Sequence, residues 1–262
     1  YTRGGNRALM KNKTLVIVVK GIVTIVLFVI IFFCLYRLFF IYEDRKNQKD
    51  EYDKIIDISE IKDDKSEEQV NKINFKELSI INPDIVGWLT IEGTNINYPI
   101  VQTDNNTYYL KHSFEKKYSN YGAIYMDATA DKNFNSLNTF IYGHNTSNGT
   151  MFGELKKFMK QSFYDEHKNI FIYTKDKNYK LEVFSVHIDT ASSKSYQMNF
   201  ATMDSYKKYI DLMQDYSVIK TNVDINYETD KIVSLYSCSH ERGNSKLDRY
   251  FIHGKIQEVG GI

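Results

Sequence analysis

The sequence predicts a mainly β domain with inserted helices, preceded by a single membrane-spanning helix. Many short runs alternate apolar and polar residues and end at turn residues, a pattern typical of strands. Aromatic residues make up 15% of the chain and only 2 of its 262 residues are proline, which suits strands and excludes a disordered chain. A barrel or a sandwich therefore fits better than a parallel sheet.

The membrane-spanning helix is predicted over residues 14–42, where only Lys20 and Arg37 interrupt an apolar run. Residues 15–36 are long enough to cross a bilayer, and the Lys20 side chain can reach toward the headgroups. A cleaved signal peptide is the alternative, but no small-residue cleavage site follows the run. A lipoprotein anchor at Cys34 fits less well, because bulky phenylalanines precede that cysteine.

Charges on the two sides of this segment predict its orientation. Four basic residues and no acidic ones precede it, whereas Glu43 and Asp44 dilute the positive charge after it. The positive-inside rule then places residues 1–13 in the cytoplasm and the bulk of the protein outside. Residues 43–74 are dense in charge and are interpreted as a partly helical stalk, with the globular domain over residues 75–262.

Strands and helices of the outer domain are predicted in chain order from periodicity. Residues 81–103 read as turn, strand, turn, strand, and residues 105–114 as a short helical or irregular piece. The remaining predicted strands are "GAIYMD", "NTFIYGHN", "NIFIYTK", "YKLEVFSVHIDT", "KIVSLYS" and "RYFIHGKI". Helices are predicted over residues 150–160 and 202–213, the second capped by Thr202.

The net charge and the cysteine count limit the possible functions of the chain. The net charge of +1 provides no general attraction for nucleic acid. With one of the 2 cysteines inside the apolar segment, no disulfide can brace the outer domain. Cys238 is then an unpaired thiol in a potentially oxidising compartment, either buried and inert or used in chemistry.

The stretch "SLYSCSHERGNSKLDRYFIHG" (residues 234–254) concentrates reactive groups. If its two ends form an antiparallel pair, Cys238 ends the first strand and Arg249 begins the second, so the two become neighbours. His253 lies four residues further along and is interpreted as structural. His240 beside Cys238 suggests a metal site only weakly, and no metal or cofactor is expected.

A nucleophilic cysteine needs a proton-transfer partner and a group that stabilises negative charge. Among the 6 histidines, His144 ends a predicted strand and enters a polar loop, where catalytic groups are often displayed. Cys238, His144 and Arg249 are therefore the first candidates.

These residues resemble the motifs of a known family. "FIYGHN" with His144, "SLYSC" with Cys238 and "RYFIHG" with Arg249 are similar to the His, Cys and Arg motifs of sortases. "GWLTIEGTNINYPIVQTDNNTYYL" and "GHNTSNGTMFGEL" favour class B of that family. The resemblance covers about residues 81–256.

The resemblance implies an eight-stranded closed β-barrel and a membrane-anchored cysteine transpeptidase of Gram-positive bacteria. Cys238 would attack the Thr carbonyl of an NPxT- or PxTG-like sorting signal, His144 would act as acid and then base, and Arg249 would stabilise the oxyanion. The partners would be surface proteins and a peptidoglycan amine. Substrate-binding residues carried over from the family are Asn106, Leu110, Tyr142 and Ser237.

The sequence departs from the family at the cysteine motif, where TLxTC reads "SLYSC". The hydroxyls survive, but the large Tyr236 changes the expected shape of the substrate groove. The long connection before Arg249 leaves Arg242 as a rival for the arginine role. A cysteine peptidase that only hydrolyses and a non-catalytic, membrane-tethered binding domain remain the alternative functions.

Overall fold

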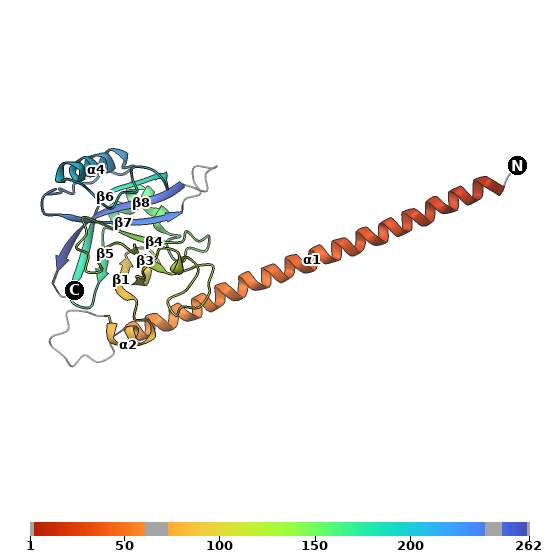
Figure 1. Ribbon diagram of the computed structural model, residues 1–262, viewed down its shortest axis with the longest axis horizontal. Coiled ribbons are helices and arrows are strands. Elements are labelled where there is room, and N and C mark those ends of the chain that lie inside the picture. The colour runs from red at the N-terminus through yellow and green to blue at the C-terminus, as the bar shows by residue number, and fades with distance from the viewer. Residues whose placement is uncertain (1–2, 61–72, 239–247, 261–262) are drawn as a thin grey trace. The chain divides into compact units, whose positions relative to one another are not determined.

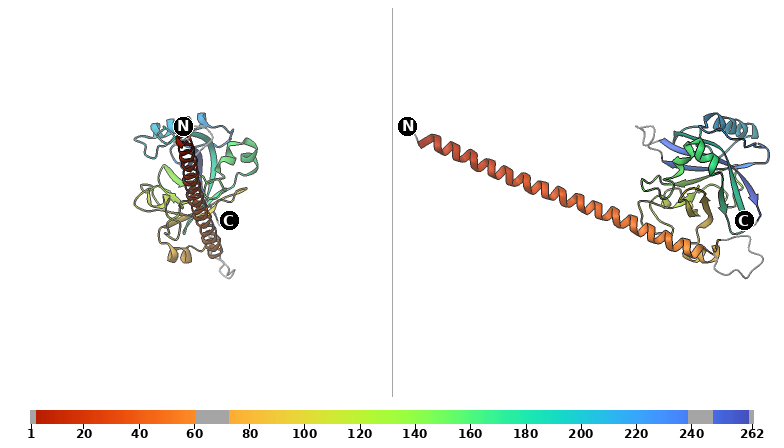
Figure 2. Two further views of the ribbon diagram at one scale, coloured as in Figure 1. Left: turned by 90° about the vertical axis from the view of Figure 1, so that its right-hand side faces the viewer. Right: turned by 180° about the vertical axis from the view of Figure 1, so that it is seen from behind.

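The computed structural model describes residues 3–60, 73–238 and 248–260. It contains a long N-terminal helix and a β-rich unit (Figures 1 and 2). The helices are α1 (Arg3–Ser59), α2 (Phe75–Ile81), η1 (Tyr108–Leu110), η2 (Leu155–Met159), α3 (Gln161–Glu166) and α4 (Met203–Tyr216), of which η1 and η2 are 3₁₀. The strands are β1 (Ile85–Ile91), β2 (Asn97–Val101), β3 (Ile124–Met126), β4 (Asn138–Gly143), β5 (Ile170–Tyr173), β6 (Asn178–Thr190), β7 (Lys231–Cys238) and β8 (Asp248–Val259).

The eight strands form a closed barrel in the order β1-β2-β3-β4-β7-β8-β6-β5. The pairs β2–β3 and β4–β7 are parallel, and the other pairs are antiparallel. Closure leaves no open sheet edge, so the described strands satisfy one another's backbone groups. The predicted barrel and the predicted hairpin of β5 with β6 are both confirmed.

The two predicted inserted helices have different outcomes. α4 is confirmed, and the Thr202 hydroxyl caps it by accepting from the backbone N–H of Ser205 at 3.1 Å. α4 lies beside β6 (Figure 1), and its buried residues are Tyr206, Tyr209, Ile210 and Met213. The helix predicted over residues 150–160 is instead the 3₁₀ turn η2 followed by α3. The apolar spacing there reflects burial of Phe152, Leu155 and Phe158.

The chain divides into two compact units, residues 1–49 and Asp50–Ile262. In the first, α1 contains a window of 18 residues with mean hydropathy 3.1, long and apolar enough to cross a membrane. The second unit begins earlier than the expected domain start near Phe75. Tyr52 and Ile55, from the segment interpreted as a stalk, are 4% and 0% exposed and belong to its hydrophobic core.

His253 has the structural role predicted for it. Its side chain is fully buried on β8, and Nδ1 lies 2.7 Å from the Ser234 hydroxyl. Because that hydroxyl donates to Asn138 Oδ1, it must accept from His253, which places the proton of the neutral ring on Nδ1. Burial, aided by the nearby His187, holds the pKa of His253 well below its ordinary value of 6.5.

This burial predicts an acid-dependent loss of stability. Above pH 6.5 the ring is neutral in both states, but below that pH the unfolded chain binds a proton that the folded chain excludes. We expect His253 to lower the free energy of unfolding by about 1.4 kcal/mol per pH unit below about pH 6.5. Chemical denaturation at several pH values, followed by fluorescence of the buried Trp88, measures this slope. A His253→Gln variant should show a shallower slope, and equal slopes would contradict the assignment.

Candidate active site

The register of three neighbouring strands brings the predicted catalytic residues to one level of the barrel. In the parallel pair of β4 and β7, Gly143 lies opposite Ser237, so the next residues, His144 and Cys238, follow at the same level. In the antiparallel pair of β7 and β8, Cys238 lies opposite Arg249. Adjacent strands are about 4.8 Å apart, so the backbones of all three residues are close neighbours. The side chain of Cys238 lies outside what the structure describes.

A pocket of about 260 Å³ opens at this level. His144 and Arg249 line it, and so do the four residues predicted to bind substrate, Asn106, Leu110, Tyr142 and Ser237. The structure therefore brings all the described candidate side chains together. The other lining residues are Tyr125, Gly143, Tyr196 and Tyr236.

The position of His144 depends on the backbone of the preceding residue, Gly143, which packs closely against core side chains. A Cβ on the preceding Gly143 would lie 2.6 Å from Ile124 and 2.7 Å from the Phe152 ring, so only glycine fits here without displacement. The Ser237 hydroxyl donates to the Gly143 carbonyl at 2.9 Å and ties β7 to this strand end. Together these contacts determine where the half-buried His144 leaves the strand.

One ring nitrogen of His144 is engaged in a hydrogen bond to the backbone. Nε2 lies 2.8 Å from the carbonyl oxygen of Leu110, which can only accept, so Nε2 carries a proton and donates it. Nδ1 is therefore the nitrogen that can exchange a proton with a bound molecule. Burial lowers the pKa of His144 below 6.5, with nearby Lys111 adding to the effect and the Leu110 hydrogen bond opposing it.

Arg249 is supported on an aromatic surface. Its guanidinium lies 5.8 Å from the centroid of the Tyr236 ring, within cation–π distance, and Nη1 donates to its neighbour's carbonyl, Asp248 O, at 2.8 Å. Tyr236 in turn packs edge-to-face against Tyr142 at 5.4 Å and Phe251 at 5.1 Å. The large residue that interrupts the cysteine motif is therefore both a wall of the pocket and the support of the arginine.

Sequence reasoning missed Tyr125 and Tyr196 as pocket residues. Tyr125 lies within a predicted strand, with no signal that separates it from an ordinary core tyrosine. Tyr196 belongs to the irregular connection between β6 and α4, where no periodicity indicates orientation. Its hydroxyl lies 2.7 Å from that of Tyr142, which brings this connection to the pocket.

The remaining candidates from the sequence lie elsewhere. His253 and His187 are buried and do not line the pocket. His240 and Arg242 are outside the described residues.

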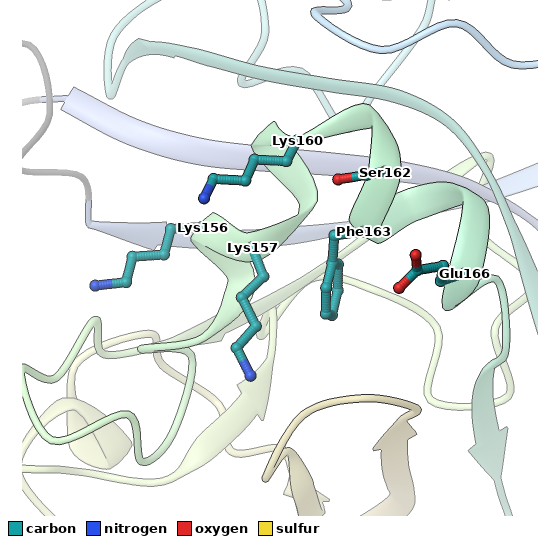
Figure 3. A pocket seen from close by; sticks show the side chains of 6 residues that line it. All are labelled: Lys156, Lys157, Lys160, Ser162, Phe163 and Glu166. Atoms are coloured by element: carbon teal, nitrogen blue, oxygen red, sulfur yellow. The ribbon is translucent and has the colours of Figure 1, made fainter.

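A second pocket of about 560 Å³ lies at η2 and α3, where Lys156, Lys157 and Lys160 lie to one side of Phe163 (Figure 3). Ser162 and Glu166 complete its lining. This pocket contains neither a cysteine nor a histidine, so the smaller pocket is the candidate active site.

Comparison with known proteins agrees with this geometry. The sequence model of the sortase domain family matches residues 89–257 of this chain. Sortase B of Staphylococcus aureus is 36% identical over 186 residues, which cover 71% of this chain and 75% of that protein. Sortase B of Listeria monocytogenes is 33% identical over 181 residues, covering 69% of this chain and 73% of that protein.

Solved structures give the same result. The S. aureus sortase B–substrate complex superposes with a TM-score of 0.72 at 32% identity, covering 83% of this chain and 98% of that one. Sortase B of Clostridium perfringens superposes with a TM-score of 0.65 at 33% identity, covering 70% of this chain and 100% of that one. The chain therefore belongs to the sortase family, the cysteine transpeptidases that anchor surface proteins to the cell wall.

Proposed function

We propose that Cys238, His144 and Arg249 carry out a two-step acyl transfer on a sorting signal of the NPxT or PxTG type. The observation that carries this proposal is the strand register, by which Cys238 and Arg249 pair at the ends of β7 and β8 and His144 directly follows the end of the neighbouring β4. The Cys238 thiolate attacks the Thr carbonyl carbon, the peptide C–N bond breaks, and a thioester forms. A peptidoglycan amine then attacks the thioester, a new amide bond forms, and the thiolate leaves.

His144 moves the proton in both steps. Its Nδ1 gives a proton to the leaving amine in the first step and takes one from the incoming amine in the second. With ordinary pKa values, a thiolate and an imidazolium coexist in only about 1% of molecules at pH 7. The lowered pKa of His144 reduces that fraction further, whereas the positive charge of Arg249 favours the thiolate.

Arg249 stabilises the oxyanion that forms in each step. Its guanidinium is held beside the pocket by Tyr236, so little reorganisation is needed when negative charge appears on the substrate oxygen. The tyrosine-rich walls, with Asn106, Leu110, Tyr142 and Ser237, bind the sorting peptide. Relatives have been solved as a sortase B–substrate complex and as sortase B with triglycine, which supports a peptide substrate and an amine acceptor here.

The apolar segment of α1 anchors this enzyme in the membrane. Its flanking charges support a cytoplasmic N-terminus, with the pocket-bearing unit outside the cell. Residues 14–42 form the anchor, residues 43–74 the connection and residues 75–262 the catalytic domain, to which residues 50–59 contribute core side chains. In this position the pocket can reach surface proteins and peptidoglycan.

The first prediction from the proposed function tests the reaction itself. With a PxTG- or NPxT-containing peptide, the protein should release the C-terminal fragment, and added triglycine should give the ligated product, detected by mass spectrometry. Cys238→Ala should lower cleavage on the order of 10³-fold or more, because no other group forms the thioester. Cys34→Ala, which removes the other cysteine, is the matched control. Hydrolysis without a triglycine adduct would identify a peptidase, and normal turnover by Cys238→Ala would exclude the mechanism.

The second prediction concerns Arg249. Arg249→Ala should lower kcat by roughly 10²–10³-fold, the usual loss when an oxyanion donor is removed, and Arg249→Lys should lose less because it keeps the charge. Arg242→Ala is the matched control for the rival arginine. A larger loss in Arg242→Ala than in Arg249→Ala would reverse the assignment.

The third prediction concerns Tyr236. Tyr236→Phe keeps the ring beneath Arg249, whereas Tyr236→Ser removes both the cation–π contact and the edge-to-face packing. These contacts are each worth about 0.5–1.5 kcal/mol, so kcat/KM of the Ser variant should be roughly tenfold below that of the Phe variant. Equal values in the two variants would show that the ring does not support the arginine.

A further inference from the structure

A buried carboxylate lies behind the wall of the active-site pocket. Asp127 follows β3 and is 0% exposed. Its Oδ1 accepts two hydrogen bonds from Thr129, from the backbone N–H at 2.8 Å and from the hydroxyl at 2.6 Å. Its Oδ2 accepts from the Tyr142 hydroxyl at 2.6 Å and from the Asn106 amide nitrogen at 2.7 Å. Burial raises the pKa of Asp127, but these hydrogen bonds outweigh burial and lower it, so the carboxylate is ionised.

The charge of Asp127 determines the direction of the hydrogen bonds that lead to the pocket. An ionised carboxylate only accepts, so the single proton of the Tyr142 hydroxyl points at Asp127. The Tyr142 and Tyr196 hydroxyls are 2.7 Å apart, and Tyr142 has no second proton, so Tyr196 must be the donor in that contact. The Tyr196 oxygen is then left with lone pairs, and within the described part of the chain no donor reaches it.

The orientation of Asn106 is determined in the same way. Its Oδ1 accepts from the backbone N–H of Ala128 at 2.8 Å, and one hydrogen of its amide nitrogen goes to Asp127. The amide is therefore held with its nitrogen toward the carboxylate. Asn106, Tyr142 and Tyr196 all line the pocket, so a single buried charge orients three polar groups of the pocket wall.

We infer that Asp127 is a positioning residue that determines which groups of the pocket wall donate hydrogen bonds and which accept them. Through Tyr142 it leaves the Tyr196 hydroxyl as an acceptor. Tyr196 then favours a sorting peptide that presents an N–H donor at the residue bound in this pocket. The inference rests on the proposed function, because it concerns the peptide bound for cleavage. It assigns a specificity role to a residue that does not touch the substrate.

The test compares matched peptides that differ in one donor. At each position preceding the scissile bond, one peptide carries asparagine and its partner carries the β-methyl ester of aspartate, which keeps the carbonyl and loses the N–H donors. For the full-length protein, the ratio of kcat/KM for asparagine over ester should be about fivefold to tenfold at one position, as expected for one neutral hydrogen bond.

Asp127→Asn should reverse this preference. Both hydrogen bonds from Thr129 require an oxygen at the Oδ1 position, so the new amide nitrogen replaces Oδ2 and donates to Tyr142. The hydrogen bond from the Asn106 amide nitrogen is lost in this variant, because two amide NH2 groups cannot bond to each other. Tyr142 then donates to Tyr196, and the Tyr196 proton points away from Tyr142. The ratio should fall to one or below at the same peptide position.

Tyr196→Phe provides a second variant that leaves Asp127 and its partners in place. It removes the acceptor oxygen, so the ratio of asparagine over ester should fall to about one. Asp131→Asn is the matched control, because this exposed aspartate four residues further on accepts from the backbone of Asn133 in its own turn and does not line the pocket. The control should keep the ratio of the unmodified protein.

The outcomes separate this inference from the proposed function. If no peptide is cleaved, the proposed function fails. If peptides are cleaved with no position that favours the donor, or if Asp127→Asn and Tyr196→Phe keep the original ratio, the inference is overturned and the transpeptidase remains. A purely structural role for Asp127 would lower both kcat/KM values together and leave their ratio unchanged.

Discussion

The candidate site depends on one constraint, the register of β7 between its two neighbours. β7 runs parallel to β4 and antiparallel to β8, and a slip of one residue on either side would separate Cys238 from His144 or from Arg249. Buried polar contacts oppose such a slip. The Ser234 hydroxyl joins Asn138 of β4 at 2.7 Å and His253 of β8 at 2.7 Å, so one side chain links all three strands inside the barrel. The chemistry at the strand ends is aligned by groups that take no part in it.

Much of this arrangement could be predicted because it follows local patterns. Alternation defined the strands, and the hairpin geometry predicted that Cys238 and Arg249 would be neighbours. His144 lies near Cys238 and Arg249 because β4 and β7 pair in parallel, with paired residues 94 positions apart in the sequence. Periodicity cannot predict a pairing between such distant strands, whereas the motif resemblance did predict that His144 acts with Cys238. Burial of Tyr52 and Ile55 in the core was not predicted, because the many charged residues around them indicated an exposed stalk. The helix expected over residues 150–160 was wrong because apolar spacing reports burial and cannot distinguish a 3₁₀ turn from an α-helix.

The polar groups of the pocket wall illustrate a deeper limit on sequence reasoning. The strand containing Tyr125 and the aspartate after it were both visible in the sequence, but the polarity of a hydroxyl depends on which partner it meets in three dimensions. Asp127 and Tyr196 are 69 residues apart, and Tyr142 joins them only because β3, β4 and the connection after β6 converge. Whether a tyrosine hydroxyl donates or accepts therefore depends on the fold around it and cannot be derived from the residue type alone.

The hydrogen bond from His144 to the Leu110 carbonyl has a kinetic consequence. In the proposed mechanism, Nε2 stays bonded to the Leu110 carbonyl, so the departing and arriving amines both exchange protons with Nδ1. The two amines cannot occupy that position together. Under the proposed role of His144, the first product leaves before the acceptor enters, which agrees with the double-displacement order that a thioacyl intermediate already requires.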